Sequence, residues 1–203
     1  FSTMGQKGVY ADYGPGWAAA SAVPGSYFKT FSTEGGLRVP LIVRFPGVVK
    51  PGTRVDSFAY VLDIMPTILE IAGVDIPGSV YDGREIYVPE GISMLPVLKE
   101  ETESVRGDDN PVGYELAGSS AVFQGKYKLM QNLAPKGTGA WELYDIESDP
   151  SELTDIADQM PELVTELKAF YASYAEEVNL VPVPEGYNPL EQTVINAKRG
   201  GSH

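Results

Sequence analysis

The stretch YFKTFSTEGGLRVPLIVRFP, residues 27–46, decides how the rest of this chain is interpreted. It carries Lys29 between aromatic residues, passes a Glu34-Gly35-Gly36 break, and ends in an apolar run over residues 39–45 that Pro46 stops. A short apolar run between such breakers is typical of a strand that is buried on both faces of a sheet. The sequence therefore predicts a core strand at residues 39–45, with Lys29 on the loop that leads to it.

Lys29 is a candidate anion ligand. An ammonium group placed near a negative charge stabilises that charge without any proton transfer, although most loop lysines are simply solvated. Glu34-Gly35-Gly36 could add backbone NH donors for an anion, or it could be a glycine turn that lets the chain enter the strand without collisions. Tyr13 and Trp17 could line an aromatic pocket near the lysine, or pack as ordinary core residues.

The composition is that of an acidic globular protein. The 203 residues are 43% hydrophobic and 21% charged, so the chain can bury a sizeable core. The 15 Lys and Arg residues against 28 Asp and Glu residues give a net charge of -13. This charge disfavours nonspecific attraction to nucleic acid or to an anionic membrane, and no apolar run is long enough to span a bilayer. We expect neither nucleic acid nor a membrane among the partners.

The chain has no cysteine, and its single histidine is His203. These residues cannot form a disulfide framework, a thiolate metal site or an internal Ser-His-Asp triad. Because Phe1 is not an initiator methionine and no signal segment is evident, we interpret the chain as a piece of a longer polypeptide. Its localisation is therefore left open. The final GGSH, residues 200–203, resembles a tag remnant.

The first half of the chain indicates an α/β layer structure. Residues 1–26 show no periodicity and predict an irregular loop, which is either functional or a fraying end. Asp63 as an N-cap, Pro66 in the first turn and Gly73 as the stop predict a helix over residues 63–72. Its packed face would contain Ile64, Ile68, Leu69 and Ala72. A buried strand followed by a helix is the pattern of an α/β fold.

The second half predicts a small antiparallel sheet with one helix. A charged stretch at residues 99–110 is the best boundary candidate. Short strand-like runs follow at residues 112–116, 121–123, 126–130 and 141–146, with a tight hairpin at Gln124-Gly125. Pro161 opens an amphipathic helix whose stripe favours core packing over a partner surface. The stripe consists of Leu163, Leu167, Phe170, Tyr171, Tyr174 and Val178.

Taken together, these segments resemble the C-terminal portion of sulfatases, in the arylsulfatase branch. The motifs follow the family's order from about Gly5 to Val178: Tyr13-Gly-Pro-Gly-Trp17, Tyr27-Phe-Lys29-Thr-Phe, Thr33-Glu-Gly-Gly-Leu-Arg-Val-Pro40, Asp63-Ile-Met-Pro-Thr67, Gly125-Lys-Tyr-Lys128, Trp141-Glu-Leu-Tyr-Asp145 and Asp149-Pro-Ser-Glu152. The resemblance implies an alkaline-phosphatase-like α/β fold. It implies that residues 1–110 form the C-terminal part of the catalytic core, residues 111–181 a smaller α+β subdomain, and residues 182–203 an extended tail.

The resemblance also implies an activity, the hydrolysis of small-molecule sulfate esters. In sulfatases the lysine of the Tyr-x-Lys-x-x-x-x-Glu-Gly-Gly region binds the sulfate group, and Lys29 is the matching position. Tyr13, Trp17 and Thr33 are then candidate substrate-binding residues. The family's nucleophile is a formylglycine made in a Cys/Ser-x-Pro-x-Arg sequence, assisted by calcium and two histidines. This chain contains neither that motif nor an internal histidine.

We therefore expect the chain to be inactive alone and to need the missing N-terminal part of the same enzyme. A phosphoester or phosphonate hydrolase of the same superfamily, or a non-catalytic module that binds a partner or carbohydrate, remains an alternative. No metal ligand is predicted, because Asp108-Asp109-Asn110 lacks the spacing of a calcium loop. An incomplete α/β core would expose apolar faces, which predicts self-association.

Overall fold

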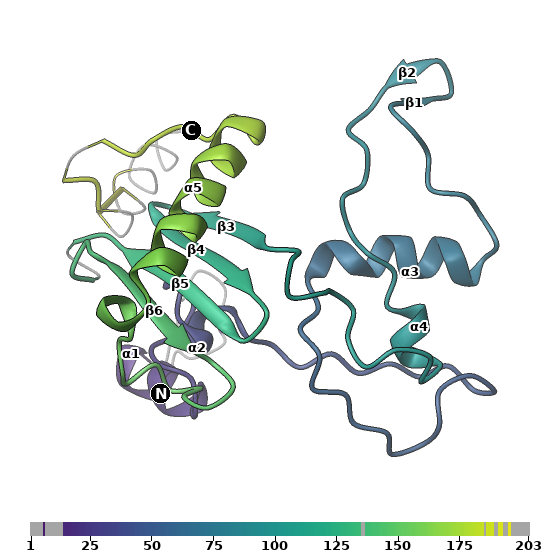
Figure 1. The fold of residues 1–203 in the computed structure, drawn as a ribbon, viewed down its shortest axis with the longest axis horizontal. Helices are drawn as coiled ribbons and strands as arrows, with labels where there is room; N and C mark the ends of the chain where they lie inside the picture. Colours follow the sequence, from purple (N-terminus) through teal and green to yellow (C-terminus); the bar gives the residue numbers. More distant parts are fainter. Residues whose placement is uncertain are drawn as a thin grey trace. The chain divides into compact units, whose positions relative to one another are not determined.

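The computed structural model describes residues 14–134 and 137–184, with Gln6, residues 186–188, Glu191, Gln192 and Ile195. Their contacts divide the chain into two units, each drawn in Figure 1. The sheet unit contains the described residues up to Val39 and those from Pro111 onwards, and the middle unit is Pro40–Asn110.

Four antiparallel strands form the sheet, and they lie side by side in chain order. They are β3 (Val112–Leu116), β4 (Ser119–Gln124), β5 (Tyr127–Asn132) and β6 (Trp141–Asp145). Gln124 pairs with Tyr127 across the turn, where Gly125 has a φ of 54°. A glycine reaches this left-handed region without a steric cost. The predicted antiparallel sheet and its hairpin are confirmed.

Helix α5 (Pro161–Glu177) lies across one face of this sheet (Figure 1). Leu167 of α5 is fully buried together with Val122, Leu129 and Leu143 from the strands. Trp141 packs edge-on against Tyr171 of α5, with ring centroids 5.2 Å apart. The predicted helical stripe is therefore a core-packing surface, except that Val178 follows the helix and is 44% exposed.

The segment before the strands belongs to the sheet unit and corrects two expectations. Helix α1 (Gly14–Ser21) occupies part of the predicted irregular loop. Its Trp-Ala-Ala-Ala core favours a helix by intrinsic propensity, but it has no polar face that a periodicity search could detect. The Glu-Gly-Gly motif is not a simple turn, because it begins the one-turn helix α2 (Glu34–Leu37).

The middle unit contains short elements and long connections. A 3₁₀ turn, η1 (Val61–Asp63), leads into α3 (Ile64–Ile71), and α4 (Leu95–Leu98) follows a two-stranded ribbon of β1 (Val80–Tyr81) and β2 (Arg84–Glu85). The predicted helix and its stop are confirmed, since Gly73 has a φ of 66° just after α3. The predicted packed face is wrong for this chain, because Ile64 and Ile68 are 38% and 58% exposed.

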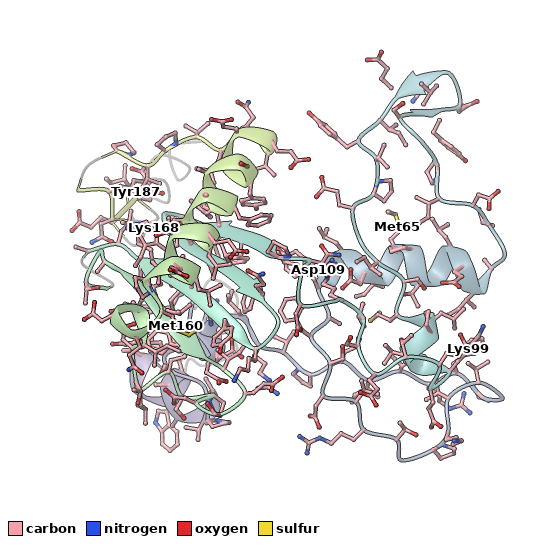
Figure 2. All side chains as sticks on the ribbon, in the orientation of Figure 1. Met65, Lys99, Asp109, Met160, Lys168 and Tyr187 are labelled. Atoms are coloured by element: carbon pink, nitrogen blue, oxygen red, sulfur yellow. The ribbon has the colours of Figure 1, made fainter. Side chains whose placement is uncertain are left out.

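The predicted strand at residues 39–45 is also wrong for this chain. The structure gives these residues no regular structure, and Val39, Leu41 and Ile42 are 78%, 54% and 91% exposed. Figure 2 shows the side chains of the middle unit, including Met65 of α3, which is 45% exposed. A buried strand needs neighbouring strands for its backbone hydrogen bonds. No segment among the described residues pairs with it.

The contacts also group the chain differently from the predicted division. The middle unit ends at Asn110, where the charged stretch ends, but the described residues up to Val39 pack with the sheet rather than with residues 40–110. The division into a core part at residues 1–110 and a subdomain at residues 111–181 stays a prediction about the whole enzyme. Most of the predicted tail lies outside the described residues.

Candidate functional site

Lys29 lies at the tip of a tight turn and is exposed. The Phe31 NH donates to the Phe28 carbonyl at 3.3 Å and closes the turn. Tyr27 and Phe31 stack with ring centroids 4.5 Å apart, and Phe28 meets Phe31 edge-on at 5.4 Å. Within the part of the chain that the structure describes, the Lys29 ammonium has no hydrogen bond or ion pair. An ordered aromatic turn thus presents a cation that is available to an anion.

Two residues beside Lys29 adopt an unusual backbone conformation. Tyr27 has a φ of 56° and Thr30 a φ of 84°. Non-glycine residues rarely enter this region, and they keep it only where the surroundings hold the backbone firmly. Strain of this kind is concentrated at functional sites, which supports a functional interpretation of the Lys29 turn.

The base of this lysine loop, residues 26–33, is closed at Ser26. The Ser26 carbonyl accepts hydrogen bonds from the Thr33 hydroxyl at 2.6 Å and from the Gly35 NH at 3.0 Å. The Ser26 hydroxyl donates to the Ser151 carbonyl, on the loop that follows β6. The two ends of the lysine loop are therefore joined to each other and to the sheet unit.

Two more hydrogen bonds attach the lysine loop to the sheet. The Ser119 hydroxyl of β4 donates to the Thr30 carbonyl at 3.3 Å, and the Ser32 NH donates to Asn132 Oδ1 of β5 at 2.9 Å. Ser119 and Asn132 are paired across β4 and β5, so both contacts come from one place on the sheet. One of these contacts involves Thr30, the residue next to Lys29.

The glycines of α2 allow the lysine loop to lie directly on that helix. A Cβ on Gly36 would come within 2.2 Å of the Phe31 carbonyl oxygen, and one on Gly35 within 2.3 Å of the Ser26 oxygen. Their NH groups donate to the Thr33 and Ser26 carbonyls, so they are not available to an anion. The glycines are needed for close packing, but against the lysine loop rather than at the entry of a buried strand.

A buried charge cluster lies below α2. Lys128 of β5 is 0% exposed, and its Nζ lies 2.9 Å from Glu34 Oε1 and 2.6 Å from Glu152 Oε1. Glu152 Oε2 accepts a hydrogen bond from the Glu34 NH at 2.9 Å. Burial raises the pKa of the Glu152 carboxyl, while the Lys128 ammonium acts in the opposite direction. We call Lys128, Glu34 and Glu152 the buried triad.

The sequence motifs included all three residues of the buried triad but did not bring them together. Their separation in the chain is large, 94 residues between Glu34 and Lys128 and 24 between Lys128 and Glu152. One feature of the sequence could have predicted a buried ion pair. Lys128 lies in a predicted strand between Tyr127 and the apolar Leu129 and Met130, and a lysine buried there needs a partner for its charge.

The other predicted site residues have different surroundings. Thr33 is 1% exposed, and its hydroxyl is committed to the Ser26 carbonyl, so it helps to close the lysine loop. Trp17 lies on α1 and is 73% exposed. Tyr13 lies outside the described residues. Lys29 and Thr33 therefore share one loop, and Trp17 is placed on a separate element.

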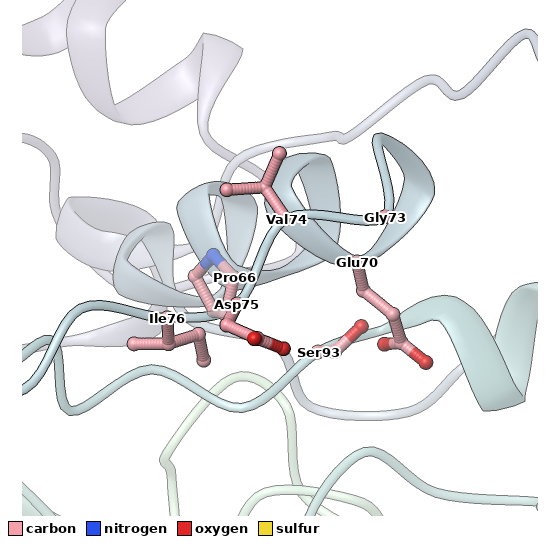
Figure 3. Close-up of a pocket in the computed structure, with 7 residues that line it drawn as sticks. All are labelled: Pro66, Glu70, Gly73, Val74, Asp75, Ile76 and Ser93. Atoms are coloured by element: carbon pink, nitrogen blue, oxygen red, sulfur yellow. The ribbon is translucent and has the colours of Figure 1, made fainter.

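A pocket in the middle unit is a poor anion site. It has a volume of about 340 Å³ and is lined by Pro66, Glu70, Gly73, Val74, Asp75, Ile76 and Ser93 (Figure 3). The carboxylates of Glu70 and Asp75 would repel a sulfate or phosphate group, and the lining contains no lysine or arginine. The exposed ammonium of Lys29 is the better candidate.

The described residues provide neither a metal-binding cluster nor a membrane-spanning helix. They contain no group of three His, Cys, Asp or Glu side chains that could hold a metal ion. No helix in the described part of the chain combines the length and apolar character needed to cross a bilayer.

Known proteins are similar over most of the chain. Residues 24–176 match the family described as N-sulphoglucosamine sulphohydrolase, C-terminal. An uncharacterized sulfatase of Schizosaccharomyces pombe is 35% identical over 184 residues, which is 91% of this chain and 33% of that protein. Arylsulfatase K of Xenopus laevis is 29% identical over 188 residues, which is 87% of this chain and 33% of the relative.

A solved structure has the same fold over most of the chain. The crystal structure of Ps i-CgsB has a TM-score of 0.61 and 24% identity, covering 75% of this chain and 32% of that one. The chain thus spans about a third of the length of the relatives that it matches.

Proposed function

The chain belongs to the sulfatase family, as a C-terminal portion of that fold, and from this premise we propose that it works within a sulfate-ester hydrolase, where Lys29 binds the sulfate group of the substrate. The observation that carries the proposal is the exposed ammonium of Lys29 on a firmly held turn, without a partner among the described residues. Lys29 is also the position that matches the sulfate-binding lysine of the family.

The chemistry of Lys29 suits this role. Its ammonium would neutralise sulfate oxygens when the ester binds, and would stabilise the negative charge that develops on the bridging oxygen as the S–O bond breaks. The chain as a whole has a net charge of -13 and opposes the approach of an anion. A local cation is therefore needed to hold the ester in place.

The proposal assigns substrate binding to this chain and nothing further. Formylglycine and calcium, which the family resemblance implies for the whole enzyme, do not fit the residues present. The sequence has no Cys/Ser-x-Pro-x-Arg motif, and the described residues hold no cluster for a metal ion. No catalytic step is therefore attributed to either group here.

The remaining part of a sulfatase is the partner that we propose for the middle unit. Many of its large apolar side chains are exposed, namely Leu41, Ile42, Val55, Val61, Leu62, Ile64, Met65, Ile68, Ile71, Val74 and Ile76. Exposed apolar surface of this extent marks an interaction site, and the chain covers about a third of its relatives' length. Without that partner, self-association through this surface stays a prediction.

The test uses the whole protein that carries this chain, with an aryl sulfate as substrate. Lys29→Met keeps the length of the side chain but removes its charge, and should lower kcat/KM by about 100- to 1,000-fold. Lys168→Met, at an exposed position on α5, is the matched control and should leave kcat/KM unchanged. An unaltered kcat/KM in Lys29→Met, in a protein that unfolds at the normal temperature, would remove Lys29 from the site.

The same assay separates the alternatives. An aryl phosphate offered beside the aryl sulfate distinguishes a sulfatase from a phosphoester hydrolase, because an ammonium group alone does not choose between the two anions. We expect turnover of the sulfate ester to dominate. Turnover by the 203-residue chain alone would contradict the proposed division of labour.

A further inference from the structure

The C-terminal sheet determines where the Lys29 turn can lie. The lysine loop has hydrogen bonds to β4 through Thr30, to β5 through Ser32, and to the loop after β6 through Ser26. Below these contacts, Glu34 at the start of α2 is held by Lys128 and Glu152. All of these partners follow residue 111 in the chain, whereas Lys29 precedes it.

The buried triad supplies directed hydrogen bonds, but it is not an efficient way to stabilise a core. The side chains of Lys128, Glu34 and Glu152 are 0%, 6% and 0% exposed. Removing two carboxylates and an ammonium from water is costly, and well-packed apolar residues would often stabilise a core as well. What apolar residues cannot supply is a set of directed hydrogen bonds that fixes one backbone position.

The backbone position that the triad fixes is the start of α2. Glu152 accepts the Glu34 NH through one oxygen and Lys128 through the other, while Glu34 returns its own carboxylate to Lys128. This closed ring of contacts fixes both the backbone and the side chain of Glu34. A helix start whose NH would otherwise be unpaired is thereby held in one place.

Helix α2 transmits this position to Lys29 through close backbone packing. The Phe31 NH donates to the Phe28 carbonyl to close the Lys29 turn, and the carbonyl oxygens of Phe28 and Phe31 both lie against Gly36 with no space for a Cβ. Closely packed backbone cannot absorb a displacement by a change of rotamer. A displacement of Glu34 therefore moves the turn that carries the ammonium group.

We propose that the buried triad is a positioning device, in which Lys128 and Glu152 act through Glu34 and α2 to hold the Lys29 ammonium in the geometry that binds sulfate. This inference rests on the proposed role of Lys29. It assigns a positioning role to Lys128 and Glu152, which are about 100 or more residues after Lys29 in the sequence. Neither residue contacts the substrate in this account.

The experiment is a double-mutant cycle in the whole protein, with inorganic sulfate as a competitive inhibitor of aryl sulfate hydrolysis. Lys128→Met and the milder Glu152→Gln are each made with Lys29 intact and in the Lys29→Met background. We expect each to weaken sulfate inhibition about 10-fold with Lys29 present, and by less than about 2-fold once Lys29 is gone. A residue with a purely structural role would have the same effect in both backgrounds.

Two controls separate positioning from loss of stability. Lys126 lies two residues from Lys128, but its side chain pairs with Asp145 on the surface. Lys126→Met should therefore leave sulfate inhibition unchanged. Leu143→Val trims the core on the α5 face of the sheet, and should lower the unfolding temperature without weakening sulfate inhibition. If Lys128→Met does not fold, Glu152→Gln and these controls still decide the result.

The outcomes of this experiment are distinct. Additive effects of Lys29→Met and Glu152→Gln overturn the positioning role but leave the proposed function in place. A Leu143→Val variant that weakens sulfate inhibition as strongly as Glu152→Gln overturns it too. Normal inhibition in the Lys29→Met single variant removes the proposed function itself.

Discussion

The sheet unit and the middle unit use their apolar residues in opposite ways. In the sheet unit, Val122, Leu129, Leu143 and Leu167 are all 0% exposed and pack together between the strands and α5. In the middle unit, Ile42 is 91% exposed and Ile68 is 58% exposed. Both units are rich in apolar residues, so composition does not account for the difference. What differs is that the described residues cover the apolar face of the sheet unit and leave that of the middle unit exposed.

This difference shows what an apolar pattern in a sequence can and cannot predict. The apolar residues of β5 and α5 lie within about 40 residues of each other in the chain, and they pack together as predicted. The pattern at residues 39–45 is equally strong, but no described residue offers a neighbouring strand. The exposed apolar surface of the middle unit is what we expect if the remaining part of a sulfatase covers it, as proposed above.

Hydrogen exchange of the 203-residue chain is the strongest way to break the comparison. Backbone amides of β4, β5 and the middle of α5 should exchange at least about 1,000-fold more slowly than those of residues 39–45. The physical reason is that the first group is hydrogen-bonded inside a buried core, whereas the second has neither ladder bonds nor cover. Similar protection in both groups, measured by mass spectrometry at low protein concentration, would contradict this comparison.

A matched pair of substitutions sharpens the comparison. Leu167→Ala removes a fully buried side chain from the sheet unit and should cost about 2–5 kcal/mol of unfolding free energy. Ile42→Ala, at a 91% exposed position, should change that free energy by less than about 0.5 kcal/mol in this chain. Urea titration followed by circular dichroism measures both. In the whole enzyme, Ile42→Ala should become destabilising if the middle unit is covered there.

The smallest expected effect concerns a surface ion pair of the sheet unit. Lys126 Nζ lies 2.7 Å from Asp145 Oδ2, and this contact lowers the pKa of Asp145 below its ordinary 3.8. The ionised pair therefore stabilises the folded state above the unfolded pKa, and this contribution is lost as the pH falls through the lower folded pKa. Lys126→Met should reduce the urea midpoint slightly at neutral pH, and the difference should vanish once the pH lies well below the lowered pKa of Asp145. A difference that persists in acid would show that the pair acts through packing.

Much of the fold could be predicted because its signals are local. The hairpin at Gln124-Gly125, the helix that Pro161 begins and the helix that Gly73 ends each follow from a few neighbouring residues. The alkaline-phosphatase-like α/β fold class, which was inferred from a series of motifs, is confirmed by the sulfatase relatives. Helix α1 was missed because its alanines carry no periodic pattern.

The candidate site could be predicted only in part, because its supports are not local. Lys29 was identified by its family resemblance, and its role in sulfate binding stays a prediction. The support of its turn by Ser119, Asn132 and Lys128 depends on pairs that lie about 90 to 100 residues apart, which no periodicity reveals. Asp63 is similar, since it was expected as a helix cap, but its buried carboxylate accepts the Tyr60 and Ile92 amides and pairs with Arg106.

The hydrogen bonds between the lysine loop and the strands have a consequence for shortened forms of the protein. A premature stop codon shortly after Asn110 would leave Lys29 in the product but delete Ser119, Lys128, Asn132, Ser151 and Glu152, which hold its turn. Such a product would retain Lys29 but lose the hydrogen bonds that hold its turn. If Lys29 binds sulfate as proposed, such a product should therefore bind the anion poorly although Lys29 itself is intact.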